Sequence, residues 1–403
     1  MLNKDTAISE KARLYFPNIA GVRAIAAFGV IIHHIEQTKW LAGINNSFMK
    51  PAVLLFGSLG VILFFVLSGF LITYLLIAEK EKSGTVQIKK FYIRRLLRIW
   101  PLYFLIIIAG LFIFPYIPFF TFPVWSSDVF WHYGTKIILF FLILPNVSLL
   151  LYPPMPYMKQ TWSIGVEEQF YLLWPIIIKF SKTYLRPLLI ITFSFMMATL
   201  FLFWLTNKEF MKSSAWLPAL NFIKQYIATF RVGSMAIGGI AAYIAYFKPA
   251  RVLKVIFSPA LQWGLYIVLI LFLLKGVTVP YVQNEFYSAL FALAIINLAC
   301  NKRSVVSLKN SVFEYFGKIS FGLYMYHPVA IILSLKIAKQ TLVNDSGLLF
   351  NIILYISAII ITIVMAGLSY KYIEAYFLKF KDRFTPGNTG LQQMRVQNKA
   401  SFS

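Results

Sequence analysis

The sequence predicts an all-α protein that crosses a membrane repeatedly, with ten transmembrane helices. Hydrophobic residues make up 59% of the 403 residues and charged residues only 13%, which is more apolar surface than a soluble domain of this length needs. Apolar runs of about 20 residues, the length that a helix needs to cross a bilayer, recur along the whole chain. The basic residues between these runs indicate how the helices are oriented.

Ten of the apolar runs are predicted to cross the membrane, with boundaries good to about four residues. They lie at 17–38, 52–78, 99–118, 162–180, 186–206, 221–246, 257–275, 285–300, 318–337 and 347–370. An eleventh run, residues 135–151, is predicted to be a partial or re-entrant element that does not complete a crossing. The Pro-rich stretch "LYPPMPYMKQ" follows it. Irregular backbone at membrane depth is tolerated only where protein shields it or where it lines a cavity.

Lysine and arginine gather in alternate connections between the runs. Of the 38 basic residues, 26 lie in one set of segments: the N-terminus, 79–98, 179–186, 247–256, 301–318 and the tail from 371. Basic loops stay on the cytoplasmic side, so ten crossings with both termini inside are predicted. A full crossing by 135–151 would turn every later basic loop outward. This topology accounts for the net charge of +24 without a nucleic-acid partner.

One transmembrane domain, residues 16–375, is predicted between a cytoplasmic N-terminus, residues 1–15, and a disordered cytoplasmic tail, residues 376–403. The single cysteine, Cys300, excludes an intrachain disulfide and a multi-cysteine metal site, and no metal site is predicted. The chain has no Walker loop, no nucleophilic-serine elbow and no H-E-x-x-H sequence. The polar residues inside the apolar runs are therefore the main indication of function.

The first apolar run contains two polar residues, Arg23 and His34, on one helical face. They are eleven residues apart, which is about 20° past three full turns and about 16 Å along the axis. His33 points about 100° away from His34. With the N-terminus inside, Arg23 lies in the cytoplasmic half of the helix and His34 near its outer end. The alternative for His34 is an interfacial residue in contact with water.

The segment "WSIGVEEQFYLLWP", residues 162–175, opens the fourth predicted span from the outer side. Its Glu167 is predicted to lie at the same depth as His34. A carboxylate beside an imidazole holds its tautomer and stabilises the imidazolium. The alternative is that Glu167 and its neighbour Glu168 are interfacial carboxylates in water.

A cluster of arginines, Arg94, Arg95 and Arg98, lies in "KKFYIRRLLRIWP", which leads into the third span from the cytoplasm. Their three- and four-residue spacing brings them together on a helix. Guanidinium groups bind phosphate with two parallel hydrogen bonds, so this cluster is a candidate phosphate site. The alternative is anchoring to anionic lipid.

Further polar residues inside the spans are candidates for a polar cavity. Small residues around Ser68, in "GVILFFVLSGFLI", also permit close helix packing. Arg231 is a buried cation that needs a partner or a cavity. Tyr326 and His327 come directly before Pro328, which is expected to kink the helix, and polar groups at a kink suggest a cavity wall. The remaining candidates in this group are Trp162, Glu168, Tyr326 and His327.

These segments together resemble the membrane acyltransferase-3 family, ten-span enzymes that modify bacterial glycans. The resemblance runs in order from about 16 to about 375. "RAIAAFGVIIHH" is similar to the family's first-helix pattern, which selects Arg23 and His34, and "RRLLRIWP" contains its R-x-x-R motif as Arg95 and Arg98. "TWSIGVEEQFYLLWP" resembles the segment that favours Glu167, and "GVILFFVLSGFLI" and "ISFGLYMYHPV" resemble two further motifs.

The chain departs from the family pattern at three positions. The family often carries an acidic residue where this chain has Ala20, Ile62 and Gly233. These differences leave Arg23 and Arg231 with fewer expected partners. Many relatives also carry a C-terminal extracytoplasmic hydrolase-like domain, and this chain is expected to be a form without it.

The resemblance implies an acyl-CoA donor, most often acetyl-CoA, used as a substrate, with no tightly bound cofactor. Its phosphates would lie on Arg95 and Arg98 first, with Arg94 nearby. Arg23, deeper on the same side, would bind pyrophosphate or guide the pantetheine arm. The implied location is the bacterial inner membrane, with membrane lipids as further partners.

The implied acceptor is a hydroxyl of a glycan or glycolipid at the extracytoplasmic side. His34 would act as the general base on that hydroxyl, oriented by Glu167. Two other function classes stay open from the sequence. A transporter or flippase of a lipid-linked saccharide would also use intramembrane cations, and a non-catalytic sensor of acyl lipids is the third possibility.

Overall fold

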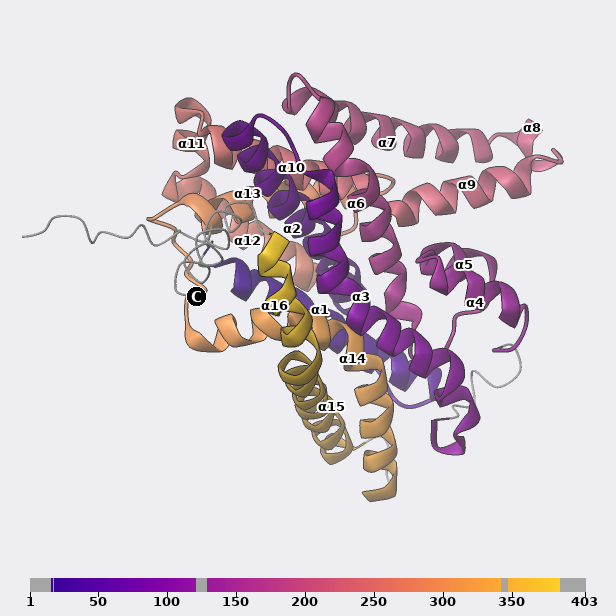
Figure 1. Cartoon of the computed structure of the whole chain (residues 1–403). Helices are drawn as coiled ribbons and strands as arrows, with labels where there is room; N and C mark the ends of the chain where they lie inside the picture. The colour runs from indigo at the N-terminus through magenta and orange to yellow at the C-terminus, as the bar shows by residue number, and fades with distance from the viewer. Residues whose placement is uncertain (1–15, 17, 121–128, 342–346, 385–403) are drawn as a thin grey trace, which may run out of the picture.

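The computed structural model describes residues 16, 18–120, 129–341 and 347–384, and every regular element in them is helical (Figure 1). The long helices that build the bundle are α1 (Ile19–Leu41), α2 (Pro51–Ser83), α3 (Ile88–Phe112), α6 (Trp162–Phe180), α7 (Leu185–Thr206), α9 (Leu217–Phe230), α10 (Val232–Phe247), α12 (Pro259–Lys275), α13 (Gln283–Cys300), α14 (Ser311–Thr341) and α15 (Leu348–Ser369). The predicted N-terminal segment 1–15 lies outside the described residues.

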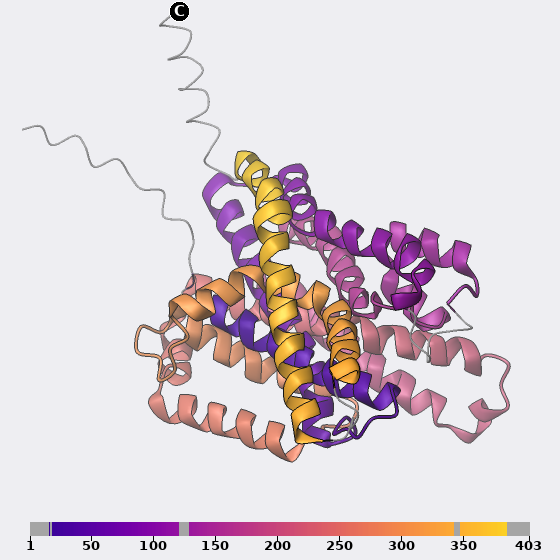
Figure 2. The same cartoon turned by 90° about the horizontal axis from the view of Figure 1, so that it is seen from below.

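Short helices complete the described chain. They are η1 (Phe114–Tyr116), η2 (Pro118–Phe120), α4 (Tyr133–Phe141), α5 (Pro145–Leu151), η4 (Lys159–Thr161), α8 (Glu209–Lys212), α11 (Ala250–Ile256), η5 (Tyr370–Glu374), α16 (Ala375–Lys381) and η6 (Asp382–Phe384). Figure 2 shows α15, η5 and α16 following one another as a nearly continuous rod along one side of the bundle.

Each of the ten predicted spans corresponds to helical structure, and seven helical segments are long and apolar enough to cross a membrane by themselves. An eighth is the bent pair α11 and α12, whose axes meet at 54°. The two remaining predicted spans are α6 and α13, which have 19 and 18 residues and carry acidic side chains in their first halves. An all-α polytopic membrane protein is therefore confirmed, and the number ten stays a prediction.

The apolar run at 135–151 forms two short helices that do not cross a bilayer. Helix α4 has nine residues and α5 has seven, so each is shorter than half of the roughly 30 Å hydrocarbon thickness. Ile143 lies between them in a left-handed conformation, with φ of 59°, which turns the chain sharply. The predicted partial element is present.

The predicted disordered tail begins with ordered structure. Residues 375–381 form α16 and residues 382–384 form a 3₁₀ turn, so the first nine tail residues, 376–384, are helical. Helix α16 packs against α3, and a guanidinium nitrogen of Arg94 donates a hydrogen bond of 2.8 Å to the Phe384 carbonyl. These tertiary contacts hold a segment whose sequence alone suggested no order. The rest of the tail lies outside the described residues.

Helix α2 lies at the centre of the packing, against α1 on one side and α10 on another, while α14 joins α1 to α15. The contact of α2 with α10 depends on glycines. A Cβ at Gly69 would lie 1.9 Å from the Met235 carbonyl oxygen, and one at Gly238 would lie 2.1 Å from the Val66 carbonyl oxygen. The small residues of the second span therefore allow close helix packing, as one interpretation of that motif predicts.

Two irregularities in long helical segments matter for the polar residues. The span 217–247 is broken at Arg231, whose φ of 43° separates α9 from α10. The last span changes to a π-helix over Tyr370–Glu374, a distortion that is often found at functional sites. In Figure 1, α7 and α9 extend from the bundle as a hairpin.

Candidate functional site

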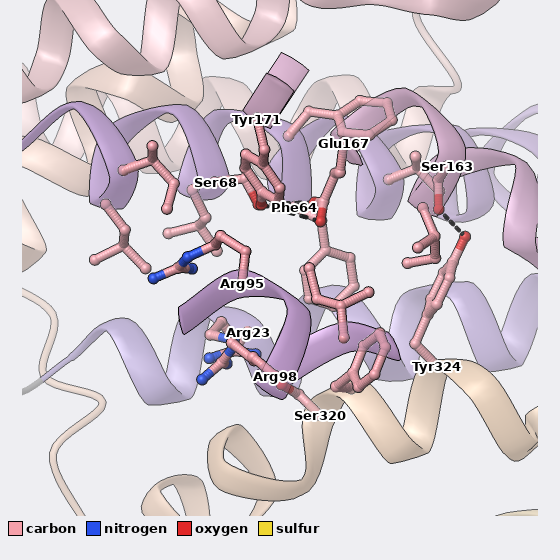
Figure 3. Close-up of a pocket in the computed structure, with 18 of the residues that line it drawn as sticks. Arg23, Phe64, Ser68, Arg95, Arg98, Ser163, Glu167, Tyr171, Ser320 and Tyr324 are labelled. Carbon is pink, nitrogen blue, oxygen red and sulfur yellow. Dashed lines mark hydrogen bonds between the residues drawn. The ribbon is translucent and has the colours of Figure 1, made fainter. Parts of the chain in front are cut away.

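The first cavity lies between α1, α2, α3, α6 and α14 and has a volume of about 230 Å³ (Figure 3). Its walls combine apolar side chains of α2 with polar groups from the other helices. The polar and charged side chains that line it are Arg23, Ser68, Arg95, Arg98, Ser163, Glu167, Tyr171, Ser320, Tyr324 and Lys381.

The first cavity is strongly basic. Arg23, Arg95, Arg98 and Lys381 line it, and Glu167 is the single carboxylate among its lining residues. The structure thus brings together the arginines predicted at Arg95 and Arg98 with the arginine of the first helix. The guanidinium of Arg95 lies 5.7 Å from the Phe91 ring centre, and its Nε is buried without a hydrogen-bond partner among the described residues. Such unsatisfied buried donors favour an anionic ligand.

Glu167 is held inside the first cavity by two hydroxyl groups. The Ser68 hydroxyl donates a hydrogen bond of 2.7 Å to Oε1, and the Tyr171 hydroxyl donates one of 3.1 Å to Oε2. The basic groups that act electrostatically on Glu167 are Arg23 and Arg98. Ser68, a residue predicted only for a polar cavity, therefore orients this carboxylate.

The structure does not bring Glu167 and His34 together. His34 lines a different cavity, and neither hydrogen bond of Glu167 involves it. The contact between Glu167 and His34 that was expected from their equal depth in the membrane is therefore not observed. Depth along the membrane normal does not specify on which side of a bundle a side chain lies, and Glu167 faces Arg23 instead.

Arg94 lies apart from the other arginines of its cluster. One of its terminal nitrogens pairs with Glu79 Oε2 at 3.1 Å and another donates to the Phe384 carbonyl oxygen. Both partners of the ion pair are 8% exposed. Arg94 does not line the first cavity, and its contacts tie α3 to α2 and to η6.

Glu168 is also separated from Glu167. It accepts a hydrogen bond of 3.2 Å from the indole nitrogen of Trp100, and its Oε1 is buried without a partner among the described residues. Glu168 lines none of the three cavities described here. Of the two adjacent carboxylates, only Glu167 reaches a cavity.

Two charged residues of the first site were not identified from the sequence. Glu374 lies on the π-helix, is 6% exposed, and acts electrostatically on Arg98 and Arg23. Lys381, from α16, lines the cavity beside the arginines. The sequence offers one local indication of these two residues, an acidic residue among basic ones in "YKYIEAYFLKFK". Their position at the site depends on the packing of this segment against α3, which only the fold determines.

The second cavity has a volume of about 300 Å³ and is built around the end of α1, η4 and α14. The polar residues that line it are His34, Gln37, Thr38, Tyr157, Lys159 and Gln160. Lys159 lies outside the spans, and burial lowers its pKa. Trp40 and Tyr157 add aromatic surface, so the cavity presents hydrogen-bonding groups beside planar rings.

His34 is held in one tautomer. Its Nδ1 lies 2.9 Å from the Val30 carbonyl oxygen. A carbonyl oxygen only accepts hydrogen bonds, so Nδ1 carries the proton and Nε2 keeps its lone pair. The residue that fixes this tautomer is thus a backbone carbonyl one turn earlier in α1. Nε2 is the nitrogen through which His34 could accept a proton.

The two neighbouring histidines of His34 differ in their surroundings. His33 bonds to the Val53 carbonyl through Nδ1 at 2.9 Å and faces α2, where a Cβ at Gly57 would lie 2.4 Å from its ring. His327 is fully buried, and its ring centre lies 4.8 Å from that of His34. The helical phase therefore separates His33 from the cavity, and the fold adds His327.

Arg231 is the predicted residue that lines a third cavity, of about 210 Å³, between α7, α9, α10 and α13. It lies 5.3 Å over the Trp162 ring. A Cβ at Gly233 would lie 3.2 Å from the Glu285 carboxylate, so α13 places an acidic group where the sequence of α10 lacks one. Tyr326 is buried, 8% exposed, and lines none of the three cavities.

Comparisons with known proteins show which family this sequence is similar to. A family model described as an acyltransferase domain matches residues 16–370. O-acetyltransferase OatA of Staphylococcus aureus (strain NCTC 8325 / PS 47) is 29% identical over 384 residues, which cover 89% of this chain and 57% of that protein. OatA of strain COL gives the same identity and coverage.

The chain spans about 60% or less of the length of the curated relatives that it matches. No solved structure matches the chain.

Proposed function

Because this chain belongs to the acyltransferase family, we propose that it is an integral-membrane O-acetyltransferase that moves an acetyl group from acetyl-CoA to a hydroxyl of a glycan or glycolipid. The observation that carries the proposal is the pair of chemically different cavities. The first is lined by four cations and one carboxylate, and the second contains a histidine with an available lone pair.

The first cavity is the proposed donor site. The phosphate groups of acetyl-CoA carry several negative charges, and Arg95, Arg98 and Lys381 offer matching cations at the end of the bundle where α3 begins. The positive-inside distribution of loop charges supports a cytoplasmic location for this end. Arg23 of α1 lines the same cavity beside Arg98 and adds a fourth cation (Figure 3).

The proposed general base is His34. Its Nε2 accepts the proton of the acceptor hydroxyl as the oxygen forms an ester bond to the acetyl carbon. The thioester C–S bond breaks, and the same proton is delivered to the departing thiolate. Proton transfer of this kind contributes roughly 10²–10⁴ in rate. The second cavity, with its amides, hydroxyl and aromatic rings, is the proposed acceptor site.

Glu167 takes a different role from the predicted one. With two hydroxyl donors and Arg23 and Arg98 nearby, it balances part of the charge of the donor cavity. We infer that it keeps the arginines in position when no phosphate is bound. The enzyme is proposed to lie in the bacterial cytoplasmic membrane.

The test is transfer of label from radioactive acetyl-CoA to extracted glycan in membranes that contain the protein. We expect His34→Ala to abolish transfer, because no other side chain offers a free ring nitrogen to the second cavity among its lining residues. His33→Ala is the matched control, since His33 faces α2 and should leave most activity. Equal transfer by wild type and His34→Ala, at equal protein levels, contradicts the assignment. Movement of a lipid-linked saccharide without acetylation would favour a flippase.

A further inference from the structure

A thin wall of side chains separates the two cavities. Among the described residues the cavities share no lining residue, yet their linings approach each other along two helical segments. Ser163 lines the first cavity and Gln160, three residues earlier, lines the second. Tyr324 lines the first cavity and Pro328, four residues later in α14, lines the second. An acetyl group on its way from the donor cavity to His34 must therefore pass this wall.

The side chain of Tyr324 is anchored in the wall by two hydrogen bonds. Its hydroxyl donates to the Gln160 carbonyl oxygen at 2.9 Å and contacts the Ser163 hydroxyl at 2.7 Å (Figure 3). The Ser163 hydroxyl also donates to the Gln160 carbonyl oxygen, at 3.3 Å, so either hydroxyl can be the donor in the bond between Ser163 and Tyr324. Tyr324 is buried, with 6% of its surface exposed. Rotation of its side chain out of the wall would break both hydrogen bonds.

Phe64 of α2 completes the wall on the donor side. Its ring centre lies 5.8 Å from that of Tyr324 in an edge-to-face arrangement. Phe64 packs against all three hydrophobic clusters of the bundle, so its position depends on most of the surrounding helices. Beyond the wall, the ring of His327 lies 5.8 Å from Tyr324 and 4.8 Å from His34.

The polarity of the first cavity indicates which end of the donor meets this wall. In Figure 3 the guanidinium groups of Arg23, Arg95 and Arg98 lie on one side of the cavity, and Ser163 and Tyr324 lie on the other. A donor whose phosphates bind the arginines presents its acyl end to Phe64 and Tyr324. The space for the acyl chain is therefore limited by two packed aromatic rings, of which that of Tyr324 is also hydrogen-bonded.

We propose that Phe64 and Tyr324 form an acyl-length filter, which admits an acetyl group to His34 and excludes longer acyl chains. Each additional methylene must displace a packed ring, which costs free energy in a close-packed interior. Discrimination by one methylene in such a pocket is roughly 10- to 200-fold. This inference rests on the proposed function, since it assigns the specificity of the same donor cavity.

The test uses acetyl-, propionyl- and butyryl-CoA as donors for the same membranes and glycan. We expect Phe64→Leu, which removes the flat ring, to lower the ratio of acetyl to butyryl transfer by roughly tenfold or more. Tyr324→Phe keeps the ring but frees it from Gln160 and Ser163, and it should lower the ratio by a smaller factor. Leu75→Ala is the matched control, because Leu75 lines the same cavity about 16 Å farther along α2 and should leave the ratio unchanged.

The outcomes separate the filter from the proposed function. If Phe64→Leu and Tyr324→Phe transfer acetyl groups with the wild-type preference, the filter is wrong and the enzyme assignment stands. If Leu75→Ala shifts the ratio as much as Phe64→Leu, the length limit does not lie at these rings. If the unsubstituted protein transfers no acyl group from any donor, the proposed function fails first. Tyr324→Phe decides the question should Phe64→Leu not accumulate in the membrane, since it changes only one oxygen atom.

Discussion

Arg94 and Arg95 are adjacent in the sequence and lie in different environments. Arg95 faces the first cavity over aromatic rings, whereas Arg94 is buried in an ion pair with Glu79. Helical phase alone does not decide which of two neighbouring arginines reaches a ligand, because either could face the bundle interior. The neighbours on α2, α6 and the end of the chain make that decision here.

We expect the two arginines to fail in different ways when replaced. Arg95→Ala should raise the KM for acetyl-CoA about tenfold or more, as loss of a charged hydrogen bond to phosphate does, with little change in thermal stability. Arg94→Ala leaves the Glu79 carboxylate buried without its partner, which costs about 3–5 kcal/mol in proteins, so it should lower the Tm in detergent.

Donor titrations and thermal unfolding of both purified variants provide the measurement. Arg98→Ala is a second donor-site variant and should behave like Arg95→Ala, since it lines the same cavity. A wild-type KM for Arg95→Ala together with a raised KM for Arg94→Ala would reverse the assignment.

At the scale of helices, the contact with α10 helps to hold α2, which supplies Phe64 and Ser68 to the first cavity. Arg231, where the broken span continues into α10, lines the third cavity instead. The glycines at this contact allow the two backbones to approach closely. The sequence indicated small residues for packing, but it did not show which helix they meet.

The helix contact predicts a strong effect of a single methyl group. In Gly69→Ala the new Cβ would lie 1.9 Å from the Met235 carbonyl oxygen, which requires the helices to move apart. Overpacking of this kind costs about 1–3 kcal/mol, so the Tm should fall and acetyl transfer with it.

Gly264→Ala on α12 is the matched control, because a Cβ at Gly264 has no neighbour within 4 Å. It should leave the Tm unchanged or slightly raised, since alanine favours helix more than glycine does. Thermal unfolding of both variants in the same detergent is the measurement. Equal Tm values for the two variants would exclude the close α2–α10 contact.

At the scale of the whole molecule, the orientation in the membrane rests on the alternation of basic loops. It predicts that the α13–α14 connection lies on the cytoplasmic side and the α8–α9 connection outside. Ser307 and Ser213 are exposed in these two connections. They provide a matched pair of positions for labelling.

We expect opposite labelling of the two positions by a membrane-impermeant thiol reagent on intact cells. In a Cys300→Ala background, Ser213→Cys should react directly, and Ser307→Cys should react only after permeabilisation. Labelling of Ser307→Cys from outside would invert the topology and place the arginine-lined cavity on the extracytoplasmic side.

The sequence by itself determined the helical membrane class and the partial element at 135–151, and it predicted a shared helical face for Arg23 and His34, which line different cavities in the structure. These depend on local properties: run length, loop charge and a repeat of about 3.6 residues per turn. It also separated His33 from His34, because 100° of helical rotation is a local quantity.

Only the tertiary structure decided which polar groups meet. It turned Glu167 toward Ser68 and Arg23, buried Arg94 against Glu79, and brought Tyr324 to Ser163, 161 positions away in the chain. It also ordered α16, so that Lys381 reaches the donor cavity. These contacts depend on how helices pack around one another, and neither membrane depth nor helical phase specifies which neighbour a side chain faces.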